Sequence, residues 1–126
     1  MARPLDFAAV TDHSEWLGEV AVCTDPASPV YDEAACREVR PGGTDEERAA
    51  WAAERRAGRG PIVCGEDGRA CRDGLTTAWS ETQAAAERHY DRSSDCQFTT
   101  FHAWEYSRAP GLSKVHRNVI LRNEIA

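Results

Sequence analysis

No stretch of this sequence approaches the roughly 18 consecutive apolar residues of a membrane-spanning helix, so no membrane partner is expected. The G-x-S-x-G element of serine hydrolases, the P-loop and the H-E-x-x-H zinc motif are also missing, which leaves those chemistries without support. The 15 Lys and Arg residues against 21 Asp and Glu residues leave a net charge of −6. This acidic balance argues against non-specific nucleic-acid binding. It does not exclude an anionic substrate, because bound metal cations can reverse the local potential.

Cysteine, in contrast, is abundant, with five residues in a short chain and no C-x-x-C pair: Cys23, Cys36, Cys64, Cys71 and Cys96. The missing C-x-x-C pair argues against a zinc knuckle or a thioredoxin-like motif. Cys64 and Cys71 flank a glycine-containing loop that can close on itself, and Cys23 and Cys36 flank a proline-containing loop. We therefore predict the disulfides Cys23–Cys36 and Cys64–Cys71, with Cys96 left over and five free thiols as the alternative. Two disulfides imply an oxidising compartment.

Two helices and one early strand stand out from the pattern of side chains. Residues 5–13, LDFAAVTDH, form a mostly apolar run that is typical of a strand covered on both faces. Residues 44–57 are predicted to be helical, with Thr44 and Glu47 as a capping box and Gly58 past the end. A second helix is predicted from about residue 75 to residue 91, because Leu75, Trp79, Thr82, Ala86 and Tyr90 form one stripe.

Two further strands are predicted near the end of the chain. Residues 96–107 and 114–123 are rich in aromatic and β-branched side chains, with a turn between them. Residues 24–43 and 59–74 are predicted to be loops, with at most a short helix at 32–39. The alternation of strand, helix and strand favours an α/β fold with a largely parallel sheet. The length of the chain fits one domain.

Four side chains at predicted strand ends are the main candidates for chemistry. Asp12 and His13 end the first strand, where α/β folds usually place their ligands. Glu105 lies near the end of the second strand, and His116 lies at the start of the third. A carboxylate with two imidazoles suits Zn, Mn or Fe, and Asp12 could either bind the metal or orient an imidazole. For each histidine, a structural role in packing is the alternative.

The other polar candidates are weaker. His102 is out of step with Glu105 and should point to the opposite face of its strand. His89 lies beside the helical stripe, where a packed or solvated role is expected. Arg117 and Arg122 are candidates for contacting a phosphate, although arginines near strands are common on surfaces.

Four segments then carry a resemblance: RPLDFAAVTDHSEWLGE, CTDPASPVY, CQFTTFHAWEYS and VHRNVILRN. Together they resemble the polymerase-and-histidinol-phosphatase (PHP) superfamily of metal-dependent phosphoesterases. More narrowly, they are similar to a bacterial branch known only as a domain of unknown function. The resemblance runs in one order from Arg3 to Asn123.

The resemblance implies a role for each of the four strand-end residues. His13 in TDH and His116 in VHRN would bind metal, and Glu105 in WEYS would bridge two metal ions. Asp12 would bind or orient, so Asp12 and Glu105 are the implied catalytic carboxylates. The implied reaction is hydrolysis of a small phosphoester or a phosphodiester with divalent Zn, Mn or Fe.

Superfamily members also carry a His-x-His motif on the first strand and further His and Asp-x-His ligands from later strands. A complete (β/α) barrel needs on the order of 200 residues or more. We therefore expect residues 1–126 to be a single incomplete domain, an open internal segment of a distorted PHP-type barrel with long disulfide-prone loops. Its open sheet edges would allow self-association. The implied parent protein is periplasmic or secreted.

Two functional hypotheses follow from these observations. The first is a metal-dependent phosphoesterase, active alone or after assembly with further strands. The second is a non-enzymatic, disulfide-stabilised α/β remnant that acts through protein contacts. Three ligands in place of a full set favour the second hypothesis for the isolated chain, and the resemblance favours the first for the parent protein.

Overall fold

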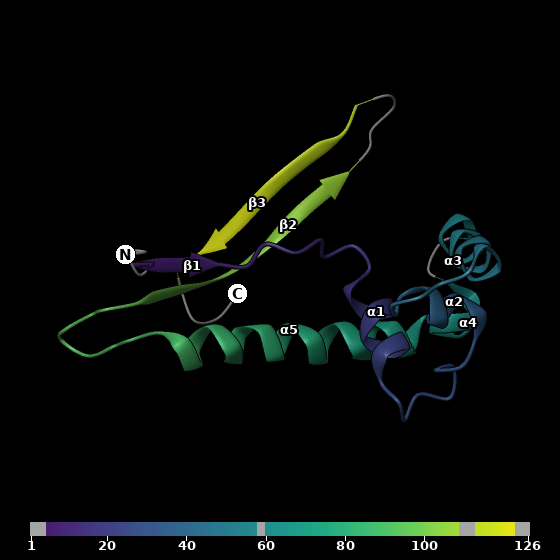
Figure 1. The fold of residues 1–126 in the computed structure, drawn as a ribbon, viewed down its shortest axis with the longest axis horizontal. Coiled ribbons are helices and arrows are strands. Elements are labelled where there is room, and N and C mark those ends of the chain that lie inside the picture. Colours follow the sequence, from purple (N-terminus) through teal and green to yellow (C-terminus); the bar gives the residue numbers. More distant parts are fainter. Residues whose placement is uncertain (1–4, 58–59, 109–112, 123–126) are drawn as a thin grey trace. The chain divides into compact units, whose positions relative to one another are not determined.

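A computed structural model of the protein describes residues 5–57, 60–108 and 113–122. The predicted Gly58, most of the turn at 108–113 and Asn123 lie outside this part. The elements, shown in Figure 1, are β1 (Phe7–Ala9), α1 (Leu17–Thr24), α2 (Ala34–Glu38), α3 (Asp45–Ala57), α4 (Pro61–Cys64), α5 (Arg69–His89), β2 (Thr99–Arg108) and β3 (Val115–Leu121). They divide into two units, residues 1–15 with 79–126, and residues 16–78. Each unit is described by itself, and the single domain stays a prediction.

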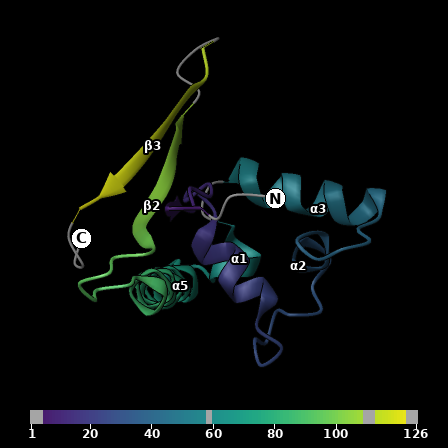
Figure 2. The same ribbon diagram turned by 60° about the vertical axis from the view of Figure 1, so that its left-hand side comes forward.

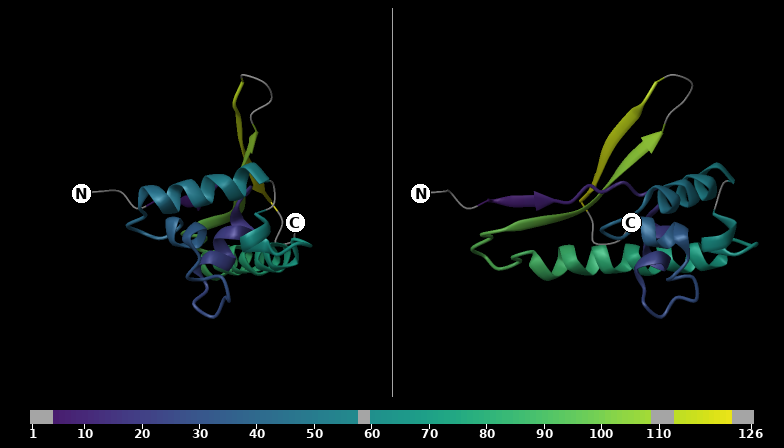
Figure 3. Two further views of the ribbon diagram at one scale, coloured as in Figure 1. Left: turned by 90° about the vertical axis from the view of Figure 1, so that its right-hand side faces the viewer. Right: turned by 45° about the vertical axis from the view of Figure 1, so that its right-hand side comes forward.

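The first unit contains a small, open sheet of three strands in the order β1-β2-β3. β1 pairs with β2 in parallel, and β2 pairs with β3 in antiparallel, so the chain has a mixed α/β fold (Figure 3). The prediction of a largely parallel sheet is therefore wrong for β3. The physical reason is the short connection from Arg108 to Val115, because parallel strands need a crossover of about a dozen residues or more.

One face of β2 packs against the second part of α5. His102 is only 6% exposed, and its ring centroid lies 4.3 Å from that of Trp79. The Trp104 ring also contacts Trp79, with centroids 5.1 Å apart, and the Thr100 hydroxyl donates to the Ala86 carbonyl. Trp79 and Ala86 of the predicted stripe on α5 therefore contact β2, and His102 lies on the opposite face of β2 from Glu105, as predicted.

The second unit, residues 16–78, has a core built around its cysteines. The buried hydrophobic residues of this core are Cys23, Ala35, Cys36, Val63, Cys64 and Cys71. Both predicted disulfides are present, Cys23–Cys36 with an S–S distance of 2.02 Å and Cys64–Cys71 with 2.04 Å. Cys96, in the first unit, is free and exposed, as predicted. Figure 2 shows α3, the longest helix that lies wholly in this unit, along its length.

The capping box of α3 is confirmed. The Thr44 N–H donates to Glu47 Oε2 at 2.8 Å, and the Glu47 N–H donates to Thr44 Oγ1 at 3.3 Å. The Thr44 N–H, followed by the Arg37 guanidinium, lowers the pKa of the Glu47 carboxyl. The reciprocal bonds satisfy two backbone groups that would otherwise lack partners at the start of the helix.

The segment 59–74 is more helical than predicted. It contains α4, and α5 begins at Arg69 rather than near residue 75. The buried Glu54 carboxylate of α3 accepts the N–H groups of Ile62 and Val63 at 2.9 and 3.1 Å, which caps α4 from a distant helix. The cap of α4 therefore comes from a tertiary contact with Glu54, which the residues around α4 do not predict. The first strand is shorter than the predicted 5–13, because regular pairing stops at Ala9.

None of the helices in the described part of the chain combines the length and the apolar character that crossing a bilayer requires.

Removing the Cys23–Cys36 bridge should destabilise the protein. A Cys23→Ser/Cys36→Ser double variant should lose about 2–3 kcal/mol of unfolding free energy, since the bridge restricts the unfolded chain. Urea unfolding followed by circular dichroism measures the loss. Cys96→Ser is the matched control and should leave the midpoint unchanged. Equal midpoints for the double variant and the control would contradict a structural role for the bridge.

Stability should fall in acid through His102. Burial lowers the pKa of this imidazole, so the unfolded chain binds the proton more readily than the folded one. The contribution of neutral His102 is therefore complete above the ordinary imidazole pKa of about 6.5 and is lost as the pH falls through the lowered folded value. Wild-type stability should decrease more steeply between about pH 7.5 and 5 than that of His102→Gln, by urea unfolding at each pH. Parallel curves would refute this assignment.

Candidate metal centre

A single backbone pairing brings His13 beside Glu105. The Glu105 N–H donates to the Asp12 carbonyl at 2.9 Å, and the Ser14 N–H donates to the Glu105 carbonyl at 3.4 Å. These bonds form an isolated parallel bridge between His13 and Glu105, which continues the register that β1 begins with β2. Since paired residues of parallel strands project to the same side, the two side chains share one face of the sheet.

The register of the hairpin brings His116 to the same face. Ser107 of β2 is opposite His116 of β3, and Glu105 is opposite Asn118. Side chains alternate along a strand, so Glu105 and Ser107 lie on one side, and directly opposite partners lie with them. This is the face of β2 that does not carry His102.

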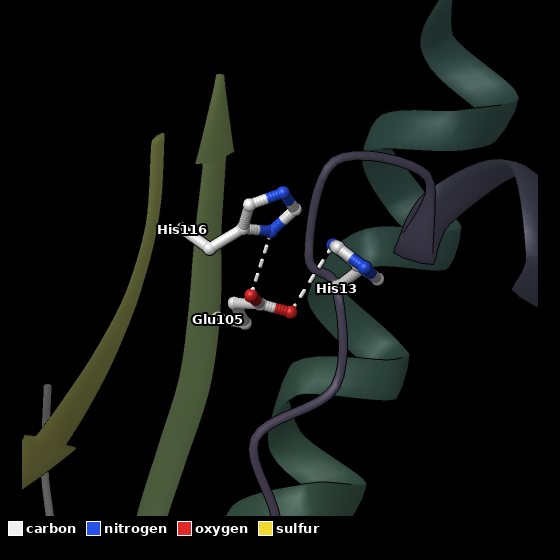
Figure 4. Close-up of side chains that lie close together, drawn as sticks. All are labelled: His13, Glu105 and His116. Carbon is white, nitrogen blue, oxygen red and sulfur yellow. Dashed lines mark hydrogen bonds and ion pairs between the residues drawn. The ribbon is translucent and has the colours of Figure 1, made fainter. Parts of the chain in front are cut away.

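Three of the four predicted ligands converge there, as Figure 4 shows: His13, Glu105 and His116. Glu105 Oε1 lies 2.8 Å from His116 Nδ1, and Glu105 Oε2 lies 3.3 Å from His13 Nδ1. The ring centroids of the two histidines are 5.5 Å apart. The His13 and His116 side chains are 57% and 48% exposed, whereas Glu105 is 18% exposed. The Glu105 carboxylate is therefore mostly buried, while the two imidazole rings beside it remain accessible to solvent.

This donor set fits a divalent cation. One atom from each residue lies within 4.8 Å of the others. Atoms bound to one ion at about 2.0–2.2 Å lie roughly 3–3.5 Å from each other, close to the separations of Glu105 from the imidazoles. A carboxylate with two imidazoles suits Zn, Mn or Fe.

A second group of possible ligands converges in residues 16–78: Glu19, Cys64 and Cys71. Its two sulfur atoms form a disulfide and therefore offer no thiolate to a metal. Burial raises the pKa of the Glu19 carboxyl beside this bridge. Its two cysteines belong to the buried core of that unit.

Asp12, the fourth predicted ligand, and the arginines Arg117 and Arg122 lie differently from the three ligands that converge. Asp12 is exposed, and its side chain is not in the group that His13, Glu105 and His116 form within the described residues. The Asp12 carbonyl accepts the Glu105 N–H, and a role of the Asp12 carboxylate at the metal stays a prediction. Arg117 is opposite Tyr106 on the face of the hairpin away from Glu105, and Arg122 is exposed just after β3.

Two residues of the site were not among the sequence predictions. Ser107 Oγ lies 2.8 Å from His13 Nδ1 and 2.9 Å from His116 Nδ1. Glu15 accepts the Ser107 N–H through Oε1, and its Oε2 lies 3.5 Å from His13 Nδ1. Strand alternation alone would have suggested Ser107, because it follows Glu105 by two positions.

Comparison with protein families gives one match that covers the chain. The family model described as "Protein of unknown function (DUF3604)" matches residues 1–126. The chain belongs to this family. Searches of the curated proteins and of the solved structures return no match to the DUF3604 chain.

Replacing Glu105 should remove metal from the DUF3604 chain. Protein purified without chelator should hold near-stoichiometric Zn, Mn or Fe, and Glu105→Gln should weaken metal binding by at least about 10-fold, since it removes the negative charge between the imidazoles. Inductively coupled plasma mass spectrometry measures the content. Asp12→Asn, which leaves its carbonyl in place, is the matched control and should keep the metal. Equal metal in wild type and Glu105→Gln would exclude this centre.

Proposed function

We propose that His13, Glu105 and His116 hold divalent metal, and that the DUF3604 chain serves phosphoester hydrolysis as part of a PHP-type metallophosphoesterase. The observation that carries the proposal is the convergence of these three side chains from three separate segments on one sheet face. The same three residues lie in the TDH, WEYS and VHRN elements that resemble the superfamily. The parallel β1–β2 pair, with α5 on the other face of β2, is compatible with an open segment of such a barrel.

A bound divalent ion would supply positive charge for phosphate oxygens and lower the pKa of a water molecule. His13 and His116 offer imidazole nitrogens, and Glu105 places its negative charge between the rings. Glu15 and Glu105 make the metal-free site acidic, in a chain with net charge −6. A phosphate is therefore repelled by the bare site, and metal binding is what makes an anionic substrate acceptable.

The exposure of the histidines suits a substrate that arrives from solvent. Both rings are about half exposed, so a phosphate group can reach the outer side of the site. We assign the Asp12 carbonyl to the positioning of Glu105, whose N–H it accepts.

A second candidate function is a role in protein contacts. β1 and β3 are the outer strands of the described sheet, and Phe7 and Ile120 are 64% and 55% exposed. Their register partners place both on the face that carries Glu105. Apolar side chains on an open sheet favour pairing with another chain, including a second copy.

The two disulfides support an oxidising location for the DUF3604 chain. Bridges of this kind persist in the periplasm and outside the cell and are rare in the cytosol. We therefore propose a periplasmic or secreted protein.

Phosphoesterase activity can be tested with p-nitrophenyl phosphate and bis(p-nitrophenyl) phosphate. Metal-loaded protein should release p-nitrophenol, EDTA should abolish the release, and added metal should restore it. Glu105→Gln should lower turnover by at least about 100-fold, because it weakens the metal site. Arg117→Ala is the control, since this residue lies on the opposite face and should leave turnover unchanged. Folded, metal-loaded protein with no turnover would reject the enzyme and favour the role in protein contacts.

A further inference from the structure

The pairing between β2 and the segment that follows β1 ends beside the candidate centre. The Glu105 N–H donates to the Asp12 carbonyl, and the Ser14 N–H donates to the Glu105 carbonyl. Hydrogen bonds recur every two residues along a parallel pair, so the next bond in this register would run from the Ser107 N–H to the Ser14 carbonyl. Residues 15 and 16 instead form a turn that leads into α1. The backbone ladder therefore stops one bond before Ser107.

The Glu15 side chain takes the place of the missing backbone acceptor. Its Oε1 accepts the Ser107 N–H, and its Oε2 lies 3.5 Å from His13 Nδ1. Backbone N–H groups alternate in direction along a strand, so the N–H groups of Ser107 and Glu105 point to the same side of β2, toward the segment that carries His13. The Glu15 carboxylate thus contacts both the strand that carries Glu105 and the ring of His13.

This contact gives the segment around His13 a second attachment to β2. The backbone bridge attaches the segment at Glu105, and the Glu15 carboxylate attaches it two residues further along β2. The His13 side chain is 57% exposed, so packing around the ring does little to fix its position. A register that is set at one point can slip or pivot, whereas two points define both the register and the direction of the segment. Loss of the Glu15 contact should therefore let His13 move away from Glu105.

We infer that Glu15 is a positioning residue of the metal centre, which completes the pairing with β2 through its side chain and so holds His13 beside Glu105. This role rests on the proposed metal site and leaves its three ligands unchanged. It depends on the reach of the side chain and on its acceptor oxygen. Glutamine, which has the same length and an acceptor oxygen, can therefore replace Glu15, but aspartate, which is one methylene shorter, cannot.

Hydrogen exchange of the Ser107 amide, followed by NMR, tests the contact in metal-free protein. Wild type should protect this amide from exchange, because Glu15 accepts its N–H. Glu15→Ala and Glu15→Asp should each exchange the Ser107 amide at least about 10-fold faster, since both lose the hydrogen bond. Glu15→Gln should keep the protection. An unprotected Ser107 amide in wild type would overturn the inference, and this measurement needs no variant to fold.

Zinc affinity, measured in competition with a chromophoric chelator, tests the consequence for the metal centre. Glu15→Ala should weaken zinc binding by at least about 10-fold, the usual effect of losing a group that orients a metal ligand. Glu15→Gln removes the charge but keeps the acceptor, whereas Glu15→Asp keeps the charge but loses the reach. Glu15→Gln should therefore bind zinc at least about 3-fold more tightly than Glu15→Asp. Glu87→Ala, which removes an α5 carboxylate paired with Arg92, is the matched control and should retain wild-type affinity.

The role of Glu15 and the metal centre can be rejected separately. Tight zinc binding that is unchanged in Glu15→Ala, or that is stronger in Glu15→Asp than in Glu15→Gln, would overturn the role of Glu15 and leave the metal centre intact. A wild-type protein that protects the Ser107 amide but binds no zinc would reject the metal centre, and with it the role of Glu15 at that centre.

Discussion

The peptide groups on either side of His13 hold both backbone polar groups of Glu105, and the other contacts of the candidate site depend on this pairing. Without it, the segment that follows β1 would not keep the register that β1 has with β2, and His13 would not be held on the same face as Glu105. The antiparallel register of β2 and β3 adds His116 to the same face. Two strand pairings thus assemble residues that are far apart in the chain.

The side chains of the candidate site then form a small network of polar contacts. Glu105 contacts both imidazoles, Ser107 contacts the same two nitrogens, and Glu15 holds the backbone of Ser107. A carboxylate between two imidazoles attracts cations and repels phosphate. Such a site can serve a phosphoester only with metal, so the proposed chemistry and the proposed cofactor depend on each other.

Residues 16–78 are stabilised by two disulfides around a small core. The buried core of this unit is small, and four of its six buried hydrophobic residues are cysteines in disulfides. Cross-links that restrict the unfolded chain offset the limited apolar area that this unit buries. This explains the high cysteine content without assigning the cysteines to metal binding or catalysis.

The sequence by itself determined the local features of the protein. The disulfide partners, the capping box at Thr44 and Glu47, the stripe on α5 and the face of His102 depend on short spacings, which local patterns encode. The candidate ligands His13, Glu105 and His116 could also be named, because each lies near the end of a strand that the sequence pattern predicts. Only the tertiary structure decided that Asp12 contributes a carbonyl, that Ser107 and Glu15 join the site, that Glu54 caps α4 and that β3 runs antiparallel. These features depend on register and on contacts between distant segments, which no local pattern of side chains specifies.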